Sequence, residues 1–509
     1  MSTASEPTTS SLLRSLSILD GAELGDLEPF PATPGPTAAA APLPRREIVE
    51  KASHPPGESV VAIAHRVAAG RLSPSVIVDQ CLERIAQLEP QLNAFVTVTG
   101  KRARADAARL ESSTSDDLPV LAGVPIAHKD IVMTAGIATS AGSRRLAGWI
   151  PDTDATIVRR LSEAGTLLLG KANTHEYATG VTGTVSAAGP TLNPWNTGRV
   201  AGGSSCGSAV AVAAGMVAAA TGTDTGGSIR IPAACCGVAG IKPTYDRISR
   251  SGVLPFAWTL DHVGVLARRS EDLAALLAVL IDSPCVTAPA RPLCESRFAI
   301  FEELCDESQP AVAAVVRDAA ATLESLGAQR CLVLLPKSWR FVHAAAAAIF
   351  LAEGGAVHGA ALRAAADQYE EETRRFLRLA DALPASRYAQ ALRMRRQLIG
   401  EFEHIFEDVD LLVCPTLPTV APLLDAETVE LPGGQVDVRA ALTRFTRLFN
   451  LTGLPAMSLP CGFEQGLPIG LQIAGRRGDD GNVLRAGMEF EGATDWLRVP
   501  VIAAPSSPG

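Results

Sequence analysis

The 509-residue chain is poor in aromatic residues (5%) and has no CxxC pair among its ten cysteines. Because this pattern gives no disulfide framework, we expect reduced thiols and a cytoplasmic protein. The chain also lacks a long basic run, and its formal net charge is −9, which argues against a nucleic-acid partner bound through its phosphates. Its 47% hydrophobic content suffices for a large core, which excludes a disordered or fibrous protein.

Signals for membrane targeting are absent as well. The first residues, MSTASEPTTSS, lack a basic start followed by an apolar block, so we predict no secretory signal. The longest apolar run, Ala209 to Ala220, is too short to span a bilayer and predicts a buried core helix. We therefore expect no membrane partner.

Composition divides the chain into regions. Residues 1–57 are rich in Pro, Ala, Ser and Thr, which is typical of a flexible arm. From Ser59 onward helix and strand patterns alternate, including a strand over Leu118 to Ile126, and predict an α/β fold whose sheet is covered on both faces. Residues 313–406 are nearly all helix formers and predict a helical insertion, after which strand-like residues resume at 411–414 and 460–471.

The segment 201–244 is unlike the rest of the chain: two clusters of Gly and Ser flank one apolar stretch. Glycine lets the backbone approach a ligand closely, and serines among such glycines can act as nucleophiles or cradle anions. One cluster alone would be explained by helix-capping turns. Two clusters that bracket a helix favour a catalytic site.

A serine nucleophile needs a base, and none of the eight histidines lies in either cluster. Lys129 directly follows the predicted apolar strand, where burial would lower its pKa and favour the neutral amine, whereas its neighbour Asp130 would point to the opposite face. A structural lysine whose amine reaches the surface is the alternative. The chain has only six lysines: Lys51, Lys101, Lys129, Lys171, Lys242 and Lys337.

Other catalytic motifs are incomplete. Residues 203–207 match a GxSxG nucleophile elbow centred on Ser205, but the preceding NPWNTGRV predicts a loop where that motif needs a strand. A Ser-His-Asp esterase of this kind would depend on His262 or His404. The HExxH zinc motif fails because Thr179 takes the place of its second histidine, and no phosphate-binding loop occurs, so we predict no cofactor and no metal.

The blocks GGSSCGSAVAVAAG, GTDTGGSIRIPA and GIKPT in residues 202–244 resemble the signature of the amidase signature family of serine hydrolases. LAGVPIAHKDI (121–131), GKANTHEYATGVTG (170–183) and FNLTGLPAMSLPCGF (449–463) resemble further family blocks in the expected order. The resemblance implies an amidase-signature α/β fold: a central, mostly parallel, twisted mixed sheet covered by helices on both faces. It also implies one domain over residues 58–509, with a signature core at about 121–285, a helical insertion at about 310–405 and a C-terminal core segment at about 406–500.

The resemblance further implies a Ser–cis-Ser–Lys catalytic unit with a cis Gly203–Ser204 peptide bond. Its members would be Ser228 as nucleophile, Ser204 as bridging residue and Lys129 as base. The backbone amides of the oxyanion hole would be those of Thr225, Gly226, Gly227 and Ser228. Supporting residues would be Ser205, Asp224 and Arg230, and candidates for the substrate pocket are Met133, Tyr177, Phe256 and Trp258.

Carried to function, the resemblance implies hydrolysis of a small-molecule carboxamide through a Ser228 acyl-enzyme, with a homodimer as a further expectation. One alternative is the amidase subunit of a tRNA-dependent amidotransferase, which needs partner subunits and glutamine as ammonia donor. Against it, HEYATGVTG (175–183) departs from the DEFAMGSS-like form of that group. The sequence is also compatible with a carbamate or ester hydrolase of the same family and with a non-catalytic binding protein.

Overall fold

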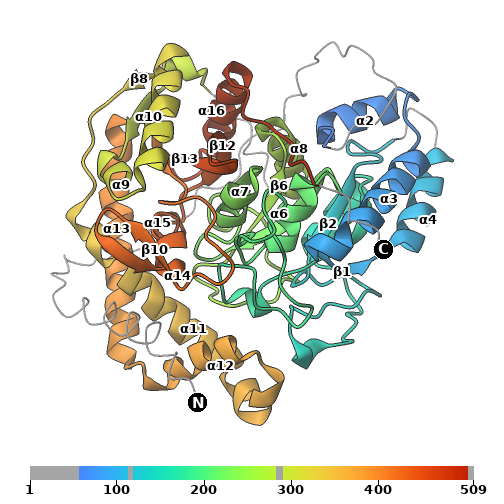
Figure 1. Cartoon of the computed structure of the whole chain (residues 1–509), viewed down its shortest axis with the longest axis horizontal. Coiled ribbons are helices and arrows are strands. Elements are labelled where there is room, and N and C mark those ends of the chain that lie inside the picture. The colour runs from blue at the N-terminus through green and yellow to red at the C-terminus, as the bar shows by residue number, and fades with distance from the viewer. Residues whose placement is uncertain (1–56, 113–117, 282–290, 503–509) are drawn as a thin grey trace.

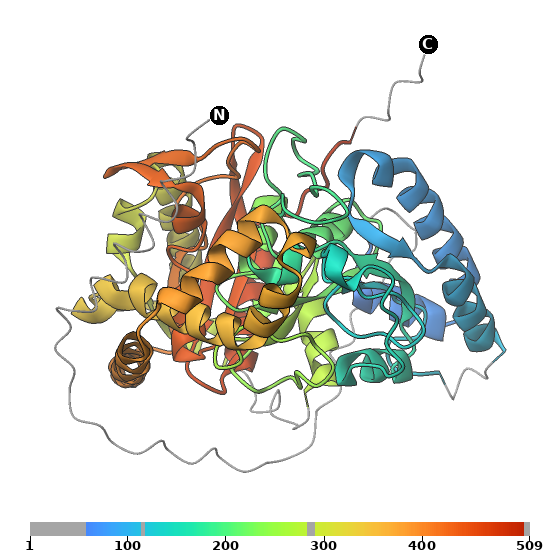
Figure 2. The same cartoon turned by 90° about the horizontal axis from the view of Figure 1, so that it is seen from below.

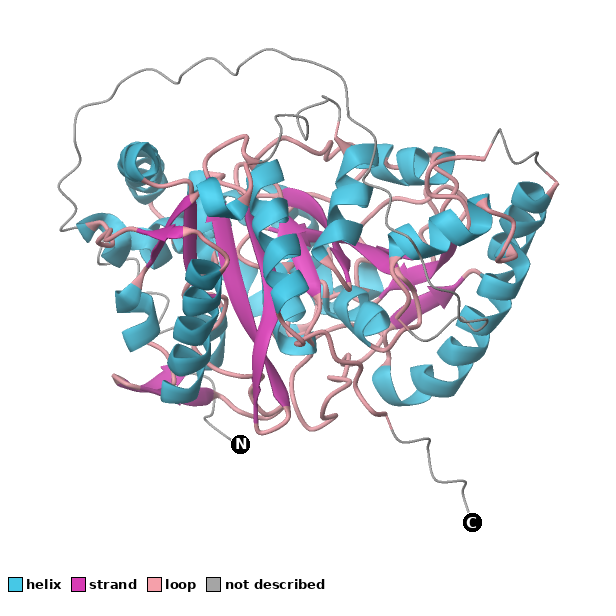
Figure 3. Cartoon of the chain, turned by 90° about the horizontal axis from the view of Figure 1, so that it is seen from above, coloured by secondary structure: helices cyan, strands magenta, loops and turns pink. Residues whose placement is uncertain are grey.

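The computed structural model describes residues 57–112, 118–281 and 291–502 (Figure 1). The arm expected over residues 1–57 lies outside the described residues except for Gly57. Strands lie between layers of helices in the view of Figure 3, as expected for an α/β fold.

One sheet of eleven strands runs through the molecule. The pairs β3–β2, β2–β4, β9–β7 and β7–β8 are parallel, and the pairs between β4 and β9, like the edge pair β1–β3, are antiparallel. The expected mixed sheet is thus confirmed. Its order is β1 (Phe95–Val98), β3 (Leu167–Ala172), β2 (Pro125–Lys129), β4 (Ala219–Asp224), β6 (His262–Ala267), β5 (Ala239–Lys242), β12 (Ala456–Glu464), β13 (Leu467–Gly475), β9 (Leu411–Pro415), β7 (Arg297–Ile300) and β8 (Gln329–Arg330). A separate hairpin pairs β10 (Thr428–Leu431) with β11 (Gly434–Asp437).

Helices cover both faces of this sheet, as two neighbouring residues of β12 demonstrate. Met457 contacts Ser270 of α8 (Ser270–Leu280), with 3.6 Å between Ser270 Oγ and Met457 Sδ, and α8 in turn packs on α16 (Asp480–Ala493). Ser458 lies on the opposite face, beside Gly470 and α7 (Arg230–Cys236). Since successive side chains of a strand point to opposite faces, α7 and the α8–α16 pair enclose the sheet between them.

Three predicted elements differ from the structure. The run Ala209 to Ala220 is not one helix: α6 (Cys206–Ala213) ends before Gly215, whose left-handed φ of 67° stops it, and β4 begins at Ala219. The strand predicted over 118–126 lies instead at β2, which ends on Lys129. Residues 460–471 belong to two strands, β12 and β13, which turn at Gln465 and Gly466, both with positive φ.

The predicted helical insertion is mostly helix. Its elements are α10 (Pro310–Ser325), α11 (Val342–Ala364), α12 (Glu371–Arg378) and α13 (Ala385–Asp408). Helix α11 packs on α12, α13 and α15 (Arg447–Thr452), and in Figure 2 part of this orange segment lies in front of the green core. The remaining helices of the described chain are α2 (Val60–Ala68), α3 (Pro74–Leu92), α4 (Gly100–Glu111), α5 (Thr156–Glu163), α9 (Glu302–Asp306) and α14 (Val438–Leu442), besides short 3-10 turns.

Helix α11 also has the length of a membrane span. Residues 337–364 are long and apolar enough, by length and composition, to cross a membrane. However, 56% of the apolar window is buried inside the protein, and Ala344 to Ala348 are all buried against the neighbouring helices. This is the pattern of a core helix, and it gives little support to a membrane span.

Candidate active site

The fold brings three distant segments together at one edge of the sheet. Strands β2 and β4 are parallel neighbours, with Ile126 paired to Ala219, so their carboxyl ends lie side by side. Lys129 ends β2, and Asp224 ends β4. Residues 225–229, which we call the nucleophile loop, then lead into α7, and the Gly203–Ser204 segment leads into α6 beside it.

Lys129 is fully buried, as the sequence predicts. Its Nζ donates to Ser204 Oγ at 2.7 Å and lies 2.8 Å from Thr223 Oγ1. Within the described ranges, no carboxylate lies within 4.0 Å of this amine. Burial lowers the pKa of Lys129 to about 7, although Cys206, Asp224 and Asp261 oppose that shift. The neutral amine is therefore available near neutral pH.

The two serines of GGSS have different environments. The Gly203–Ser204 peptide bond is cis, and the Ser204 carbonyl accepts from Thr174 Oγ1 at 3.0 Å. Ser205 Oγ contacts the backbone of Thr223, and the Ser205 amide donates to the Ser228 carbonyl at 3.2 Å. Ser204 thus contacts Lys129, whereas Ser205 connects the Gly203–Ser204 segment to the nucleophile loop.

The nucleophile loop offers fewer free amides than predicted. The Gly227 amide already donates to Asp224 Oδ1 at 2.8 Å, so it is not free for an oxyanion. The amides of Thr225, Gly226 and Ser228 have no acceptor in the part of the chain that the structure describes. This corrects the expected set of four donors to three, because the Asp224 carboxylate uses one amide to hold the loop.

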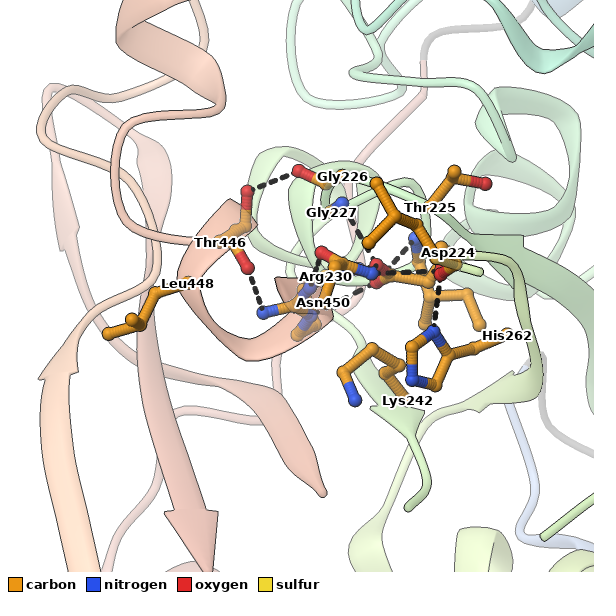
Figure 4. A network of polar contacts seen from close by, with 12 residues as sticks. Asp224, Thr225, Gly226, Gly227, Arg230, Lys242, His262, Thr446, Leu448 and Asn450 are labelled. Atoms are coloured by element: carbon orange, nitrogen blue, oxygen red, sulfur yellow. Dashed lines mark hydrogen bonds and ion pairs between the residues drawn. The ribbon is translucent and has the colours of Figure 1, made fainter. Parts of the chain in front are cut away.

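A buried ion pair fixes this loop from below (Figure 4). Arg230 Nη2 lies 2.8 Å from Asp224 Oδ1, and both side chains are 0% exposed. Burial alone would raise the pKa of Asp224, but the Arg230 guanidinium holds that pKa far below its usual range. Thr446 Oγ1 donates to the Gly226 carbonyl at 2.6 Å, and Asn450 Nδ2 donates to the Asp224 carbonyl at 2.9 Å. The supporting positions Asp224 and Arg230 are therefore the centre of a fully hydrogen-bonded network.

A cavity of about 580 Å³ adjoins the loop at Thr225 and is lined by Phe256 and Trp258, two of the four predicted pocket residues. The other two do not line it. The ring of Tyr177 packs against that of His358, with 4.6 Å between the ring centroids, and Met133 packs on the main core.

Sequence reasoning missed the aromatic side chains that the helical segment contributes beside Phe256. Phe350 stacks on Phe256 with 4.7 Å between ring centroids, and Phe376 and His358 lie next to the same ring. Helical periodicity could have placed Phe350 on the same face of α11 as His343, but nothing in the sequence indicates which neighbour that face meets.

The serine–histidine alternative lacks its base. The Nδ1 of buried His262 lies 2.6 Å from the Leu260 carbonyl, and burial holds its pKa well below the usual range. His404 lies on the surface beside Glu407. Neither contacts Ser205. Among the described residues, no group of three His, Cys, Asp or Glu side chains could hold a metal ion.

Comparison with known proteins identifies a family and several relatives that this chain resembles. The model of the family described as "Amidase" matches residues 76–484. The A subunit of glutamyl-tRNA(Gln) amidotransferase from Roseiflexus castenholzii is 38% identical, over 87% of this chain and 97% of that protein. A structure described as "Crystal structure of amidase" superposes with a TM-score of 0.81 at 33% identity, over 86% of this chain and 99% of that one. The corresponding A subunit from Thermotoga maritima superposes with a TM-score of 0.74 at 31% identity, over 88% of this chain and 98% of that one.

These relatives correct two expectations. The main functional prediction, an amidase of a small-molecule carboxamide with the amidotransferase subunit only as an alternative, is wrong, because relatives at 37–39% identity carry the name of the amidotransferase subunit. The prediction of a small-molecule partner and no nucleic-acid partner is wrong for the same reason. Net charge describes the surface of one chain and says nothing of what an assembly of several chains binds.

The sequence resemblance, the mixed sheet and the family match agree. The chain belongs to the amidase signature family, and it is an amidase, a hydrolase of carbon–nitrogen bonds in amides.

Proposed function

We propose that this chain is the amidase subunit of a tRNA-dependent amidotransferase, in which it hydrolyses the side-chain amide of glutamine and supplies ammonia to partner subunits. One observation carries the proposal: several relatives of that name match 83–87% of the chain at 37–39% identity. The departure at HEYATGVTG is confined to nine residues and does not outweigh a likeness over more than 460.

The proposed chemistry combines the contact between Lys129 and Ser204 with the role of Ser228 that the family resemblance implies. The neutral amine takes the Ser204 hydroxyl proton, and Ser204 takes the proton of Ser228 as Ser228 Oγ attacks the carboxamide carbon. The amides of Thr225, Gly226 and Ser228 hold the oxyanion, a contribution of about 3–4 kcal/mol for an important donor. The same relay returns the proton to the leaving nitrogen, which departs as ammonia. Water then hydrolyses the Ser228 ester and releases glutamate.

Partner subunits would contact the tRNA. In the proposed assembly this chain contributes the ammonia-releasing site.

The test is co-expression of the full chain with the remaining amidotransferase subunits of the same genome. We expect a stable complex that releases ammonia from glutamine and converts glutamyl-tRNA(Gln) to glutaminyl-tRNA(Gln). The same complex with Ser228→Ala should assemble but lose glutamine-dependent conversion. A chain that neither joins the complex nor supports conversion, while it hydrolyses other amides, would contradict the proposal.

A further inference from the structure

Arg447 lies directly against the nucleophile loop. A Cβ atom added at Gly226 would lie 3.7 Å from Arg447 Cγ, 3.8 Å from Arg447 Nε and 3.9 Å from Phe350 Cε2. The preceding residue, Thr446, hydrogen-bonds the Gly226 carbonyl. The base of this arginine is therefore fixed to the loop whose amides face the oxyanion, and its Nε lies beside that loop.

The charge of Arg447 has no carboxylate partner among the described residues. Its Nη1 donates to His343 Nδ1 at 3.0 Å, and no carboxylate lies within 4.0 Å of it in the described ranges; Asp437 attracts it only from farther away. Burial lowers the pKa of Arg447 to about 10, so the guanidinium stays charged at neutral pH. Burial and this arginine hold the pKa of His343 well below its usual range, so the imidazole stays neutral.

Other arginines near the site differ from Arg447 in this respect. Arg230 is paired with Asp224, and Arg444, one turn before Arg447, is paired with Glu307 at 2.7 Å. Because a half-buried cation without a carboxylate is incompletely compensated, a bound anion at Arg447 would recover part of the cost of its desolvation.

We propose that Arg447, oriented by His343, is a substrate-binding residue that receives a carboxylate of the amide substrate. The planar guanidinium fork matches a carboxylate, and one of its nitrogens is already directed by His343. Phe350 and Phe256 form an apolar wall next to the loop, suited to the methylene groups between the two ends of a substrate. The substrate class is thus a short aliphatic ω-amide that carries a carboxylate at its far end.

This inference rests on the proposed function and sharpens it, since glutamine has both groups. The assay measures kcat/KM for L-glutamine, for glutaramate (which keeps the carboxylate but lacks the amino group) and for butyramide (which lacks both), with the full chain in its complex. Arg447→Gln should lower kcat/KM for glutamine and glutaramate by roughly 10- to 100-fold, mainly through KM, and change butyramide by less than about twofold. Arg447→Lys should restore part of the loss, because it keeps the charge without the fork.

The control is Arg444→Gln, which removes a partly exposed, ion-paired arginine of the same segment and should leave all three substrates unchanged. The rate at which a fluorophosphonate labels Ser228 reports whether each variant keeps a folded site. An equal loss for all three substrates in Arg447→Gln would overturn the inference, because it would indicate a packing function beside the loop.

Further outcomes separate the two proposals. If the wild type hydrolyses glutamine and Arg447→Gln keeps its preference over butyramide, the inference fails and the proposed function stands. If the wild type rejects glutamine but hydrolyses glutaramate in an Arg447-dependent way, the proposed function fails and the inference stands. A wild type that prefers butyramide to both carboxylates would overturn both.

Discussion

The nucleophile loop and the helical segment above it differ in whether their buried polar groups have hydrogen-bond partners. Below the loop, the charges of Asp224 and Arg230 neutralise each other, and both side chains are held by further hydrogen bonds. In the helical segment, the hydroxyl of Tyr369 and the Nε2 of His358 are buried without a hydrogen-bond partner among the described residues, and so is the hydroxyl of Tyr177, whose ring packs against both. Satisfied networks fix one geometry, whereas unsatisfied groups leave room for a ligand or for change. We therefore expect the first region to fix the catalytic geometry and the second to select the substrate.

The largest expected effect comes from the nucleophile. Ser228→Ala should lower kcat for amide hydrolysis by about 10⁵- to 10⁶-fold, because no acyl-enzyme can form. Ser205→Ala removes only hydrogen bonds to the Thr223 backbone and should cost about tenfold or less. Ammonia release measured over long incubations checks both. A larger loss of activity in Ser205→Ala than in Ser228→Ala would instead support a nucleophile elbow centred on Ser205.

Removal of the base should have the next largest effect. Lys129→Met should lower kcat/KM by about 10²- to 10⁴-fold, because the relay loses its proton acceptor. In the wild type, the pKa of about 7 means that the amine is protonated and inactive below pH 7 and neutral above it. The pH profile of kcat/KM should therefore rise through about pH 7 and level off. A profile that falls over this range would contradict the assignment of Lys129 as base.

The buried ion pair below the nucleophile loop should contribute more to the free energy of unfolding than ion pairs on the protein surface. Asp224→Asn leaves the buried Arg230 charge uncompensated and should lower the free energy of unfolding by about 3–5 kcal/mol. The matched surface change, Arg317→Gln, breaks surface pairs with Glu302 and Asp306 and should cost about 0–1 kcal/mol. Denaturant unfolding of the two variants measures the difference. Equal losses would mean that the buried pair does not hold the loop.

The smallest effect is expected in the helical segment. Tyr369→Phe removes a buried hydroxyl without a partner and should change the free energy of unfolding by less than about 1 kcal/mol. Thr446→Val, by contrast, leaves the Gly226 carbonyl without its donor and should cost about 1–3 kcal/mol. Thermal unfolding of both variants tests this, and a greater loss in Tyr369→Phe would indicate a partner for that hydroxyl.

The sequence was enough to nominate the catalytic candidates, but not to predict all the residues that surround them or their contacts. Lysine is scarce in this chain, and Lys129 directly follows an apolar stretch. These two features were enough to identify Lys129 as a candidate base, because the apolar residues beside it in the sequence predict that its amine is buried. The Gly227–Asp224 hydrogen bond joins residues only three apart, but it depends on a loop conformation that no periodicity records. The position of Arg447 beside the loop depends on how segments over 200 residues apart pack, which the sequence pattern does not record either. The apolar run of residues 209–220 failed as a single helix because Gly215, within it, adopts a left-handed turn.

The partner prediction failed for a different reason. Composition and charge describe one chain, and an assembly that binds nucleic acid through a different chain leaves no trace in them. Relatives that match nearly the whole chain supplied that information.

The central claim is that Ser228 is the nucleophile, and intact mass after incubation with a fluorophosphonate probe tests it most directly. The wild type and Ser205→Ala should each gain the mass of one probe, and Ser228→Ala should gain none. Labelling that persists in Ser228→Ala and disappears in Ser205→Ala would contradict the account.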